Sequence, residues 1–386
     1  KYLLQNYGSR NLALVRGQGA HVWDNEGRRY LDLLSGLGVN NLGHCHPKVV
    51  AAIQHQAQTL LHVSNLYLIE PQARLAKLLV EHSPADRVFF CNSGTEAVEA
   101  AIKLARRYSH EQHGPGRHTI ITLQNSFHGR TMGSLSATGQ TKYQKGFEPM
   151  LERFVNVPIN DLEAMKAAVD DTVCAVLLEP VQGEGGIHPC RPDYLRGVRE
   201  LCDQRRLLLM FDEIQCGLGR SGHLFAADEF GVEPDVITLA KSLAGGVPIG
   251  AMLAKEEPAN VLSAGTHAAT FGGNPLSCAA GVAAFQVILD EKLPERSKAV
   301  GGRFKERLLQ LKQKHAAIVE VRGMGLMIGA QLAFPAAEAQ GYLREHGILA
   351  GSAGPEVLRF LPPLIVDENE LLAATEVLDK FLTTRP

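Results

Sequence analysis

Residues 207–215 read Leu-Leu-Leu-Met-Phe-Asp-Glu-Ile-Gln, an apolar run that ends in two carboxylates. Such a run, bounded by polar residues, is typical of a strand that is buried on both faces. Asp212, at the end of the run, would be expensive to bury without a partner. That partner could be a helix N-terminus, a cationic side chain or the protonated nitrogen of a heterocyclic ligand.

Four similar runs lie elsewhere in the middle of the chain, and helical stretches separate them. They are Arg87–Cys91, His118–Leu123, Val173–Leu178 and Val236–Ala240. Strands that alternate with helices predict an α/β fold in which helices cover a mostly parallel sheet. Ligands bind at the carboxyl ends of the strands in such a sheet, so the residues that follow each run are site candidates.

The two ends of the chain have a different pattern. Short alternating runs separated by Gly and Asp-Asn turns fill the first 35 residues, which predicts a small β meander. After Pro275 come two helical segments, the second over 298–315, then two short strands and a further strand. A last helix starts at Asp367, where Asp367 and Glu370 have the spacing of a capping box. We expect a small α+β domain built from residues 1–46 and 276–386, around a large domain of residues 47–275.

The composition excludes several classes of protein. The chain has 386 residues, 39 basic and 41 acidic side chains and a formal net charge of −2. High apolar content with low net charge argues against disorder, and the balance of charge argues against a nucleic-acid partner. The apolar runs are too short to cross a membrane. Seven dispersed cysteines without CxxC pairs predict reduced thiols, a cytoplasmic location and no metal site.

The segment after Arg87–Cys91 reads Asn-Ser-Gly-Thr-Glu and precedes an Ala-rich helix. Ser93 and Glu96 have the spacing of a capping box, and this explanation alone would account for the segment. The alternative is an anion site made by the hydroxyls of Ser93 and Thr95, the turn at Gly94 and the helix N-terminus.

The segment after His118–Leu123 contains Phe127, His128 and Arg130. Either aromatic ring could stack on a flat ligand while Arg130 binds a carboxylate. The alternative is a core aromatic beside a surface arginine.

Two further strand ends carry charged groups. Glu179 and Glu184 flank a Gly-rich loop in which the backbone could approach a ligand, although a solvated loop is equally consistent. Lys241 follows Val236–Ala240 among small and apolar residues. Burial there would lower the pKa of its amine and make it nucleophilic, unless the side chain reaches solvent.

These features together favour one cofactor. An anion site, a stacking ring, a carboxylate for a ring nitrogen and a nucleophilic lysine are what pyridoxal phosphate requires.

Motifs along nearly the whole chain resemble the ornithine/acetylornithine-type subgroup of class-III, fold-type-I aminotransferases. They are Gly43–Pro47, Asn92–Ala97, Phe127–Arg130, Glu179–Gly186, Phe211–Gly217, Ala240–Lys241, Thr270–Pro275 and Arg359–Pro363, in family order.

The resemblance implies a role for each candidate residue at the cofactor. Lys241 would bind pyridoxal phosphate covalently and later transfer the proton, and Asp212 would keep the ring nitrogen protonated. Gln215 would bond to the ring's phenolic oxygen, and Phe127 and Ile214 would enclose the ring. Ser93, Gly94 and Thr95 would bind the phosphate, with His128 also at the cofactor. Thr270 would reach the phosphate of a second subunit, so the resemblance implies a homodimer.

The resemblance also implies how substrates bind. Arg130 would hold the distal carboxylate of 2-oxoglutarate or glutamate, and Arg359 would hold the carboxylate beside the reacting carbon. Glu184 would pair with Arg359 when the donor has no such carboxylate. We expect N2-acetyl-L-ornithine as donor, giving N-acetylglutamate semialdehyde and glutamate in arginine metabolism. Tyr7 and Asn65 are the further substrate-binding candidates.

Other functions remain open from the sequence. Succinylornithine or free ornithine could replace acetylornithine as donor, since a few pocket contacts discriminate weakly between them. An aminomutase on the same scaffold would need no keto acid. A nucleotide-binding protein is disfavoured because neither a GxGxxG segment after a strand nor a GxxxxGK[ST] motif is present.

Overall fold

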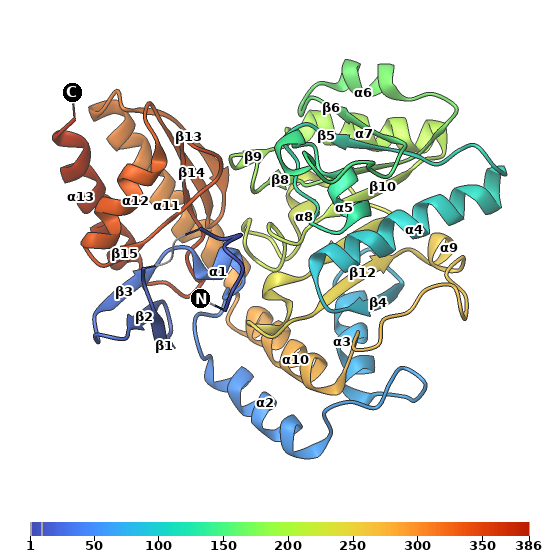
Figure 1. Ribbon diagram of the computed structural model, residues 1–386, viewed down its shortest axis with the longest axis horizontal. Helices are drawn as coiled ribbons and strands as arrows, with labels where there is room; N and C mark the ends of the chain where they lie inside the picture. The colour runs from blue at the N-terminus through green and yellow to red at the C-terminus, as the bar shows by residue number, and fades with distance from the viewer. Residues whose placement is uncertain (1, 9–10, 386) are drawn as a thin grey trace.

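The computed structural model describes residues 2–8 and 11–385, and its largest element is a seven-stranded sheet of order β4-β12-β11-β10-β7-β5-β6 (Figure 1). The strands are β4 (Arg87–Cys91), β5 (Thr119–Leu123), β6 (Phe154–Val157), β7 (Val173–Leu178), β10 (Leu208–Asp212), β11 (Val236–Leu239) and β12 (Gly250–Ala254). Neighbouring strands from β11 to β6 run parallel, whereas β12 is antiparallel to both β11 and β4. The predicted α/β class with a mostly parallel sheet is confirmed.

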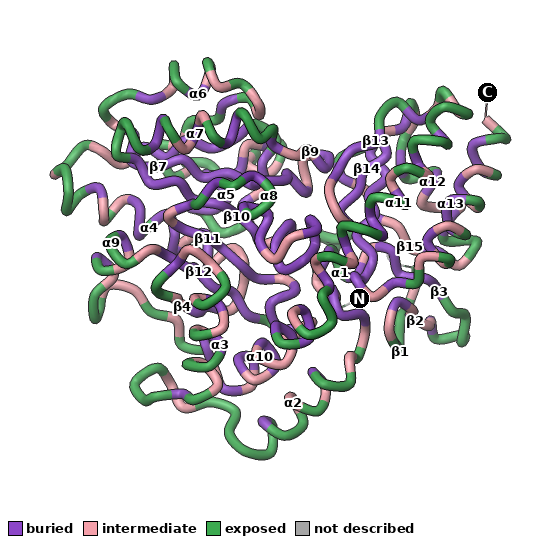
Figure 2. Tube along the Cα trace, turned by 180° about the vertical axis from the view of Figure 1, so that it is seen from behind, coloured by how far each residue is buried: buried purple, intermediate pink, exposed green. Residues whose placement is uncertain are grey.

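Apolar side chains of the sheet alternate between two cores because successive residues of a strand point to opposite faces. In β10, Leu208 and Met210 pack with the helix α4 (Gly94–His113). Leu209 and Phe211 belong to the core on the other face, which includes α7 (Pro192–Arg205) and α10 (Pro275–Asp290). The strands are therefore buried while the outer helix faces stay exposed (Figure 2).

The remaining helices of this part lie around the sheet or on the loops at its edges. They are α2 (Pro47–Thr59), α3 (Glu70–Glu81), α5 (Met132–Ala137), α6 (Leu162–Ala168), α8 (Ala226–Phe230), α9 (Glu256–Ala259) and the 3-10 turns η1 (Thr141–Tyr143) and η2 (Lys241–Ala244). A short hairpin, β8 (Val181–Gln182) with β9 (His188–Pro189), follows β7. No helix in the described ranges is long and apolar enough to cross a bilayer.

Both ends of the chain contribute to two smaller sheets, seen as the blue and red segments that lie together in Figure 1. One sheet has the order β1-β2-β3-β15 and the other β13-β14-β17-β16. Their strands are β1 (Leu14–Gln18), β2 (His21–Asp24), β3 (Arg29–Asp32), β13 (Ile318–Met324), β14 (Met327–Leu332), β15 (Ile348–Leu349), β16 (Gly351–Ser352) and β17 (Val357–Phe360). The helices beside them are α1 (Ser35–Gly38), α11 (Leu293–Lys314), α12 (Ala336–Glu345) and α13 (Glu368–Thr383).

Two local predictions at the C-terminal end need correction. The helix expected over 298–315 begins earlier, at Leu293, and Pro294 in its first turn is compatible with a helix start. Asp367 caps α13 by accepting from the backbone N–H of Asn369 at 2.8 Å. Glu370 does not complete a capping box, because its carboxylate instead lies 2.8 Å from His21 Nε2.

Candidate active site

A pocket of about 480 Å³ lies at the carboxyl ends of β4, β5, β7, β10 and β11. Parallel neighbours place their carboxyl ends at one edge of the sheet, so segments distant in sequence meet there. The predicted residues that line the pocket are Ser93, Gly94, Thr95, Phe127, His128, Arg130, Glu184, Asp212, Ile214, Gln215 and Lys241.

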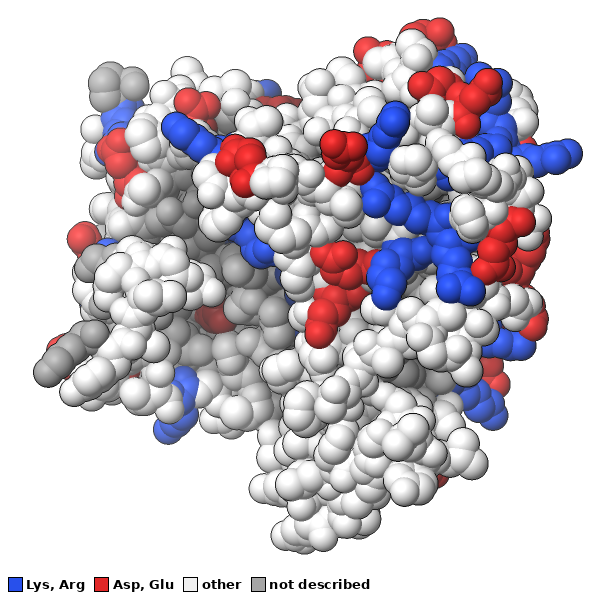
Figure 3. All heavy atoms as spheres, turned by 45° about the vertical axis from the view of Figure 1, so that its right-hand side comes forward, with Lys and Arg blue, Asp and Glu red and all other residues white. Residues whose placement is uncertain are grey.

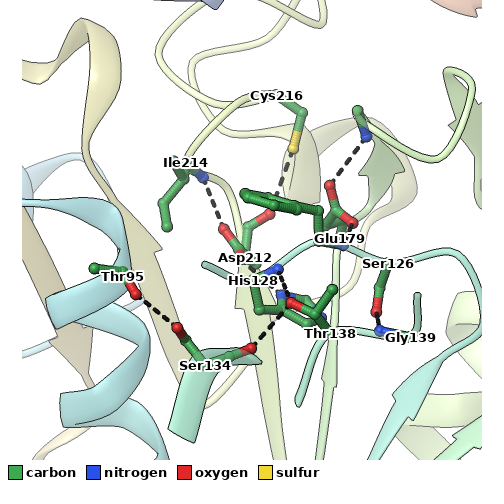
Figure 4. A network of polar contacts seen from close by, with 12 residues as sticks. Thr95, Ser126, His128, Ser134, Thr138, Gly139, Glu179, Asp212, Ile214 and Cys216 are labelled. Atoms are coloured by element: carbon green, nitrogen blue, oxygen red, sulfur yellow. Dashed lines mark hydrogen bonds and ion pairs between the residues drawn. The ribbon is translucent and has the colours of Figure 1, made fainter. Parts of the chain in front are cut away.

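Asp212 is 3 % exposed and both of its carboxylate oxygens have partners. Oδ2 lies 2.8 Å from His128 Nδ1, and Oδ1 accepts from the backbone N–H of Ile214 at 3.1 Å (Figure 4). These contacts stabilise an ionised carboxylate at the wall of the pocket. The His128 side chain is fully buried. Phe127, a half-buried residue of the pocket lining, is therefore the aromatic candidate for stacking on a ligand.

A continuous chain of polar contacts connects Asp212 with the start of α4. The backbone N–H of His128 donates to Thr138 Oγ1 at 2.9 Å, and Thr138 donates to the carbonyl oxygen of Ser134 at 3.0 Å. Ser134 Oγ lies 2.6 Å from Thr95 Oγ1 (Figure 4). The helix α5 and its flanking residues therefore fix the spacing between the two ends of the pocket.

Lys241 begins η2 immediately after β11, with a backbone φ of +39°. Burial lowers the pKa of its amine to about 8, and the positive charge of Arg359 acts in the same direction. The carboxylates of Glu184 and Asp212 oppose this shift without cancelling it. The predicted depressed pKa is confirmed, and a substantial fraction of the amine is neutral near pH 8.

The start of α4 has the geometry of an anion site. Ser93 Oγ accepts from the backbone N–H of Glu96 at 3.3 Å, and Glu96 accepts from the backbone N–H of Asn92 at 2.7 Å. Ser93 therefore caps α4, but the predicted capping box is incomplete, because the Glu96 carboxylate accepts from the backbone N–H of Asn92 and not from that of Ser93. The first-turn N–H groups of Gly94 and Thr95 are left without an intrahelical acceptor. A Cβ at Gly94 would lie 2.8 Å from Ile214 Cδ1, so this glycine lets Ile214 approach the helix start.

Arg359, on β17, lies beside this pocket and is 2 % exposed. Its Nη1 is 2.5 Å from Glu184 Oε1 and 3.4 Å from Gln215 Oε1. Burial alone would raise the pKa of Glu184, but the ion pair with Arg359 outweighs burial and holds the pKa below its usual value. From the sequence, we expect Arg359 to bind either Glu184 or a substrate carboxylate, and this ion pair is the first of those two states.

Arg130 has different surroundings. Its guanidinium carbon lies 4.0 Å from the centre of the Tyr143 ring and 5.4 Å from that of Phe127. No carboxylate pairs with it among the described residues. Two aromatic rings, which pack against each other with their planes at 85°, therefore orient a guanidinium that is exposed at the pocket and able to bind an anion.

Glu179 is a pocket residue that the sequence prediction did not assign a role. Its carboxyl group accepts from the backbone N–H groups of Phe127 at 2.9 Å and Gly183 at 3.0 Å. Burial raises its pKa to about 7. Its position directly after β7 was the available signal, but the sequence did not show that it connects two of the site's loops.

Three predicted residues lie away from this pocket in the single chain. Thr270 and Asn65 line a second pocket, and the Asn65 amide donates to the carbonyl oxygens of Ala269 and Gly272 at 3.2 and 2.9 Å. Tyr7 is 77 % exposed. Asn65 and Tyr7 do not line this pocket in the single chain, and Asn65 fixes the loop that carries Thr270, so their role in substrate binding stays a prediction.

The arrangement fits pyridoxal phosphate. The buried carboxylate of Asp212 suits a protonated ring nitrogen, and Phe127 and Ile214 line the same pocket from the loops that follow β5 and β10. The open N–H groups of α4 suit a phosphate, and Lys241 supplies an amine with a lowered pKa. Fold and site together define a pyridoxal-phosphate-dependent transferase of amino groups.

The chain belongs to the class-III aminotransferases, whose family it matches over residues 4–382. Enzymes of this family use pyridoxal phosphate as cofactor. This membership excludes the nucleotide-binding alternative.

Similar proteins include the acetylornithine aminotransferase of Methanocaldococcus jannaschii, 52 % identical over 99 % of this chain and 96 % of its own length. The succinylornithine transaminase/acetylornithine aminotransferase of Pseudomonas aeruginosa is 47 % identical over 99 % of this chain and 94 % of its own. Among solved structures, the ornithine aminotransferase of Toxoplasma gondii has a TM-score of 0.96 at 36 % identity, over 99 % of this chain and 93 % of its own.

Proposed function

We propose that this enzyme transfers the terminal amino group of N2-acetyl-L-ornithine to 2-oxoglutarate, giving N-acetylglutamate semialdehyde and glutamate. The observation that carries the proposal is the ion pair of Glu184 with Arg359 beside Lys241. The relatives named acetylornithine aminotransferase support the same donor.

Three residues perform the proton chemistry common to both halves of the reaction. Bound pyridoxal phosphate supplies a ring that withdraws electrons from the substrate carbon. Asp212, held by His128, keeps a proton on the ring nitrogen. Lys241 removes a proton from the substrate carbon and returns it on the cofactor side, and its lowered pKa leaves the neutral amine available as a base.

The carboxylates of the substrates are distributed over two arginines. Glutamate and 2-oxoglutarate carry two carboxylates, for which Arg359 and Arg130 are the partners. The reacting end of acetylornithine has no carboxylate, so Glu184 stays on Arg359 and keeps a buried guanidinium paired. Glutamate binding then requires Glu184 to leave Arg359.

We further propose that two copies of the chain form the working enzyme in the cytoplasm. Thr270 is exposed and lies in a loop apart from its own chain's pocket, which suits a contact with the phosphate of a partner. The seven cysteines of the chain are all free thiols in the structure, in keeping with a reducing compartment.

Steady-state kinetics with a panel of amine donors test the substrate. We expect the highest kcat/KM for acetylornithine or, as the second candidate supported by the relative from Pseudomonas aeruginosa, for succinylornithine. A higher kcat/KM for free ornithine would overturn the proposal. Amine transfer that proceeds without any keto acid would instead indicate an aminomutase.

A further inference from the structure

Glu99 lies on α4, outside the lining of the pocket, yet its carboxylate reaches the start of α5. Oε1 accepts from the Thr131 hydroxyl at 2.5 Å and from the backbone N–H of Ser134 at 3.0 Å. The N-cap residue of α5, Thr131, makes no side-chain capping bond of its own. Glu99 therefore supplies from another helix the cap that α5 lacks.

Gly133 permits this approach. A Cβ at Gly133 would lie only 2.4 Å from Glu99 Oε2. The Glu99 carboxylate thus occupies the space that a side chain at position 133 would need, so the close packing of the two segments requires glycine there.

Thr95 lies on the opposite side of the same hydroxyl cluster and lines the pocket. Its Oγ1 is 2.9 Å from Thr131 Oγ1 and 2.6 Å from Ser134 Oγ. It also accepts from the backbone N–H groups of Arg130 and Thr131, both at 3.3 Å. The start of α4 is in this way bonded to the segment that carries Arg130.

The donors and acceptors in this cluster can be assigned because an ionised carboxylate carries no hydrogen. Thr131 must give its hydroxyl hydrogen to Glu99, which leaves Thr131 Oγ1 as an acceptor. Thr95 Oγ1 already accepts from two backbone N–H groups. The hydroxyl hydrogen of Thr95 can be given either to Thr131 Oγ1 or to an anion in the pocket, and the two backbone N–H bonds to Thr95 Oγ1 remain in both cases.

We propose that Glu99 is a positioning residue for cofactor binding, which holds the Thr131–Ser134 segment against Thr95 and so keeps the Thr95 hydroxyl at the pocket wall, where it can donate to the phosphate of pyridoxal phosphate. The inference rests on the phosphate contact proposed for Thr95. It concerns affinity for the cofactor and not the identity of the amine donor.

The test measures cofactor binding to the full-length protein after removal of bound cofactor, without any amine substrate. We expect Glu99→Ala to weaken pyridoxal phosphate binding about tenfold, the effect of losing one to two ordered hydrogen bonds. Glu99→Gln should stay within about threefold of the unmodified protein, because both contacts are made to Oε1 and an amide oxygen can accept them. Glu111→Ala, at the far end of α4, is the matched control and should have no effect.

Pyridoxal without the phosphate separates a local effect from general damage to the fold. Glu99→Ala should leave pyridoxal affinity unchanged, and in a Thr95→Val background it should cause no further loss of pyridoxal phosphate affinity. Equal weakening of both ligands, full additivity with Thr95→Val, or a Glu99→Gln variant as weak as Glu99→Ala would overturn the proposal. Failure of the acetylornithine assignment would leave these binding results unaffected.

Discussion

Lys241 combines a left-handed backbone conformation with an amine whose pKa is lowered to about 8. Strain of this kind costs energy and persists only where surrounding structure fixes it. At this position the strain places the amine at the end of β11, among the charges of Glu184, Arg359 and Asp212.

Replacing Lys241 with Ala should remove the group that transfers the proton. We expect kcat to fall by about 10²- to 10⁴-fold from that step alone. The measurement is the turnover of acetylornithine with 2-oxoglutarate. Lys312→Ala, at an exposed position of α11, is the control, and turnover of Lys241→Ala equal to that control would contradict the assignment.

Replacing Glu184 with Ala should slow the half-reaction with acetylornithine more than the half-reaction with glutamate. Arg359 would then face acetylornithine as a buried, unpaired cation, so we expect kcat/KM for this donor to fall about 10- to 100-fold. Glutamate supplies its own carboxylate and should be affected less than about threefold. Single-turnover absorbance changes of the bound cofactor measure each half-reaction, and Glu256→Ala, in an exposed ion pair with Arg87, is the control. Equal losses for both substrates would argue against the exchange of partners.

At the scale of elements, the sequence predicted the strands whose ends carry the site but not every strand of the sheet. Gly250–Ala254 was not predicted as a strand, because a short apolar segment after a Gly- and Pro-containing loop has no distinctive period. Its antiparallel direction depends on pairing with the preceding strand β11 and with β4, which is distant in sequence.

The site residues were predictable to the extent that strand ends and the family resemblance locate them. Contacts between side chains were not. His128 and Asp212 are separated by 84 positions, so their hydrogen bond follows only from the packed sheet. The bonds of the Asn65 amide to Ala269 and Gly272 are likewise contacts that no local sequence pattern encodes.

The loop between β5 and α5 depends on Gly129. Its φ is +135°, and a Cβ there would lie 2.3 Å from Thr95 Oγ1. We expect Gly129→Ala to weaken pyridoxal phosphate binding at least about tenfold, because backbone strain and a clash displace Thr95. Gly116→Ala is the matched control, since its φ is also positive, at +103°, but its Cβ would meet no atom within 4 Å. Similar binding by the two variants in a cofactor titration would refute this explanation.

The short helix α8 is capped by a buried acid, Glu213. Its carboxyl group accepts from the backbone N–H groups of Ala226 at 2.6 Å and Ala227 at 2.9 Å. Burial nevertheless raises its pKa to about 8. In the unfolded chain this group loses its proton near pH 4.5, so between about pH 4.5 and 8 the folded state holds the extra proton.

Folding stability should therefore decrease as the pH rises through this window. Glu213→Gln cannot titrate, and the slope of unfolding free energy against pH should become less negative by up to about 1.4 kcal/mol per pH unit. Urea unfolding of the cofactor-saturated protein between pH 5.5 and 8.5 measures the slope. Unchanged slopes would show that Glu213 keeps the same charge in both states.

At the scale of the whole molecule, one surface region is apolar and exposed. The 60–68 patch consists of Leu60, Leu61, Leu66, Tyr67, Leu68 and Phe271, with Leu66 86 % exposed. His62 and Phe271 bring the two segments together, with ring centres 5.1 Å apart. The lower part of Figure 3, where Figure 1 places α2 and the segment after it, shows few charged atoms. Exposed apolar patches of this kind mark protein interfaces.

Leu66→Glu combined with Tyr67→Glu should therefore favour the monomer. Because Thr270 lies next to Phe271, we also expect the monomer to lose pyridoxal phosphate affinity. Sedimentation equilibrium and cofactor titration measure the two effects, with Val319→Glu on β13 as an exposed control. A double variant that remains dimeric would show that the 60–68 patch is not the interface.

The antiparallel strand β12 also has a consequence for how the protein is made. Gly250 pairs with Cys91, so β4, the strand that precedes α4, gains its neighbour only when much of the chain has left the ribosome. Glu184 likewise can pair with Arg359 only after a further 175 residues have been synthesised. At translation rates of about 5–20 residues per second, the stretch between Gly250 and Arg359 alone takes on the order of 5–20 s. Cofactor capture is therefore expected at the end of synthesis, and until then the apolar strands depend on protection from aggregation.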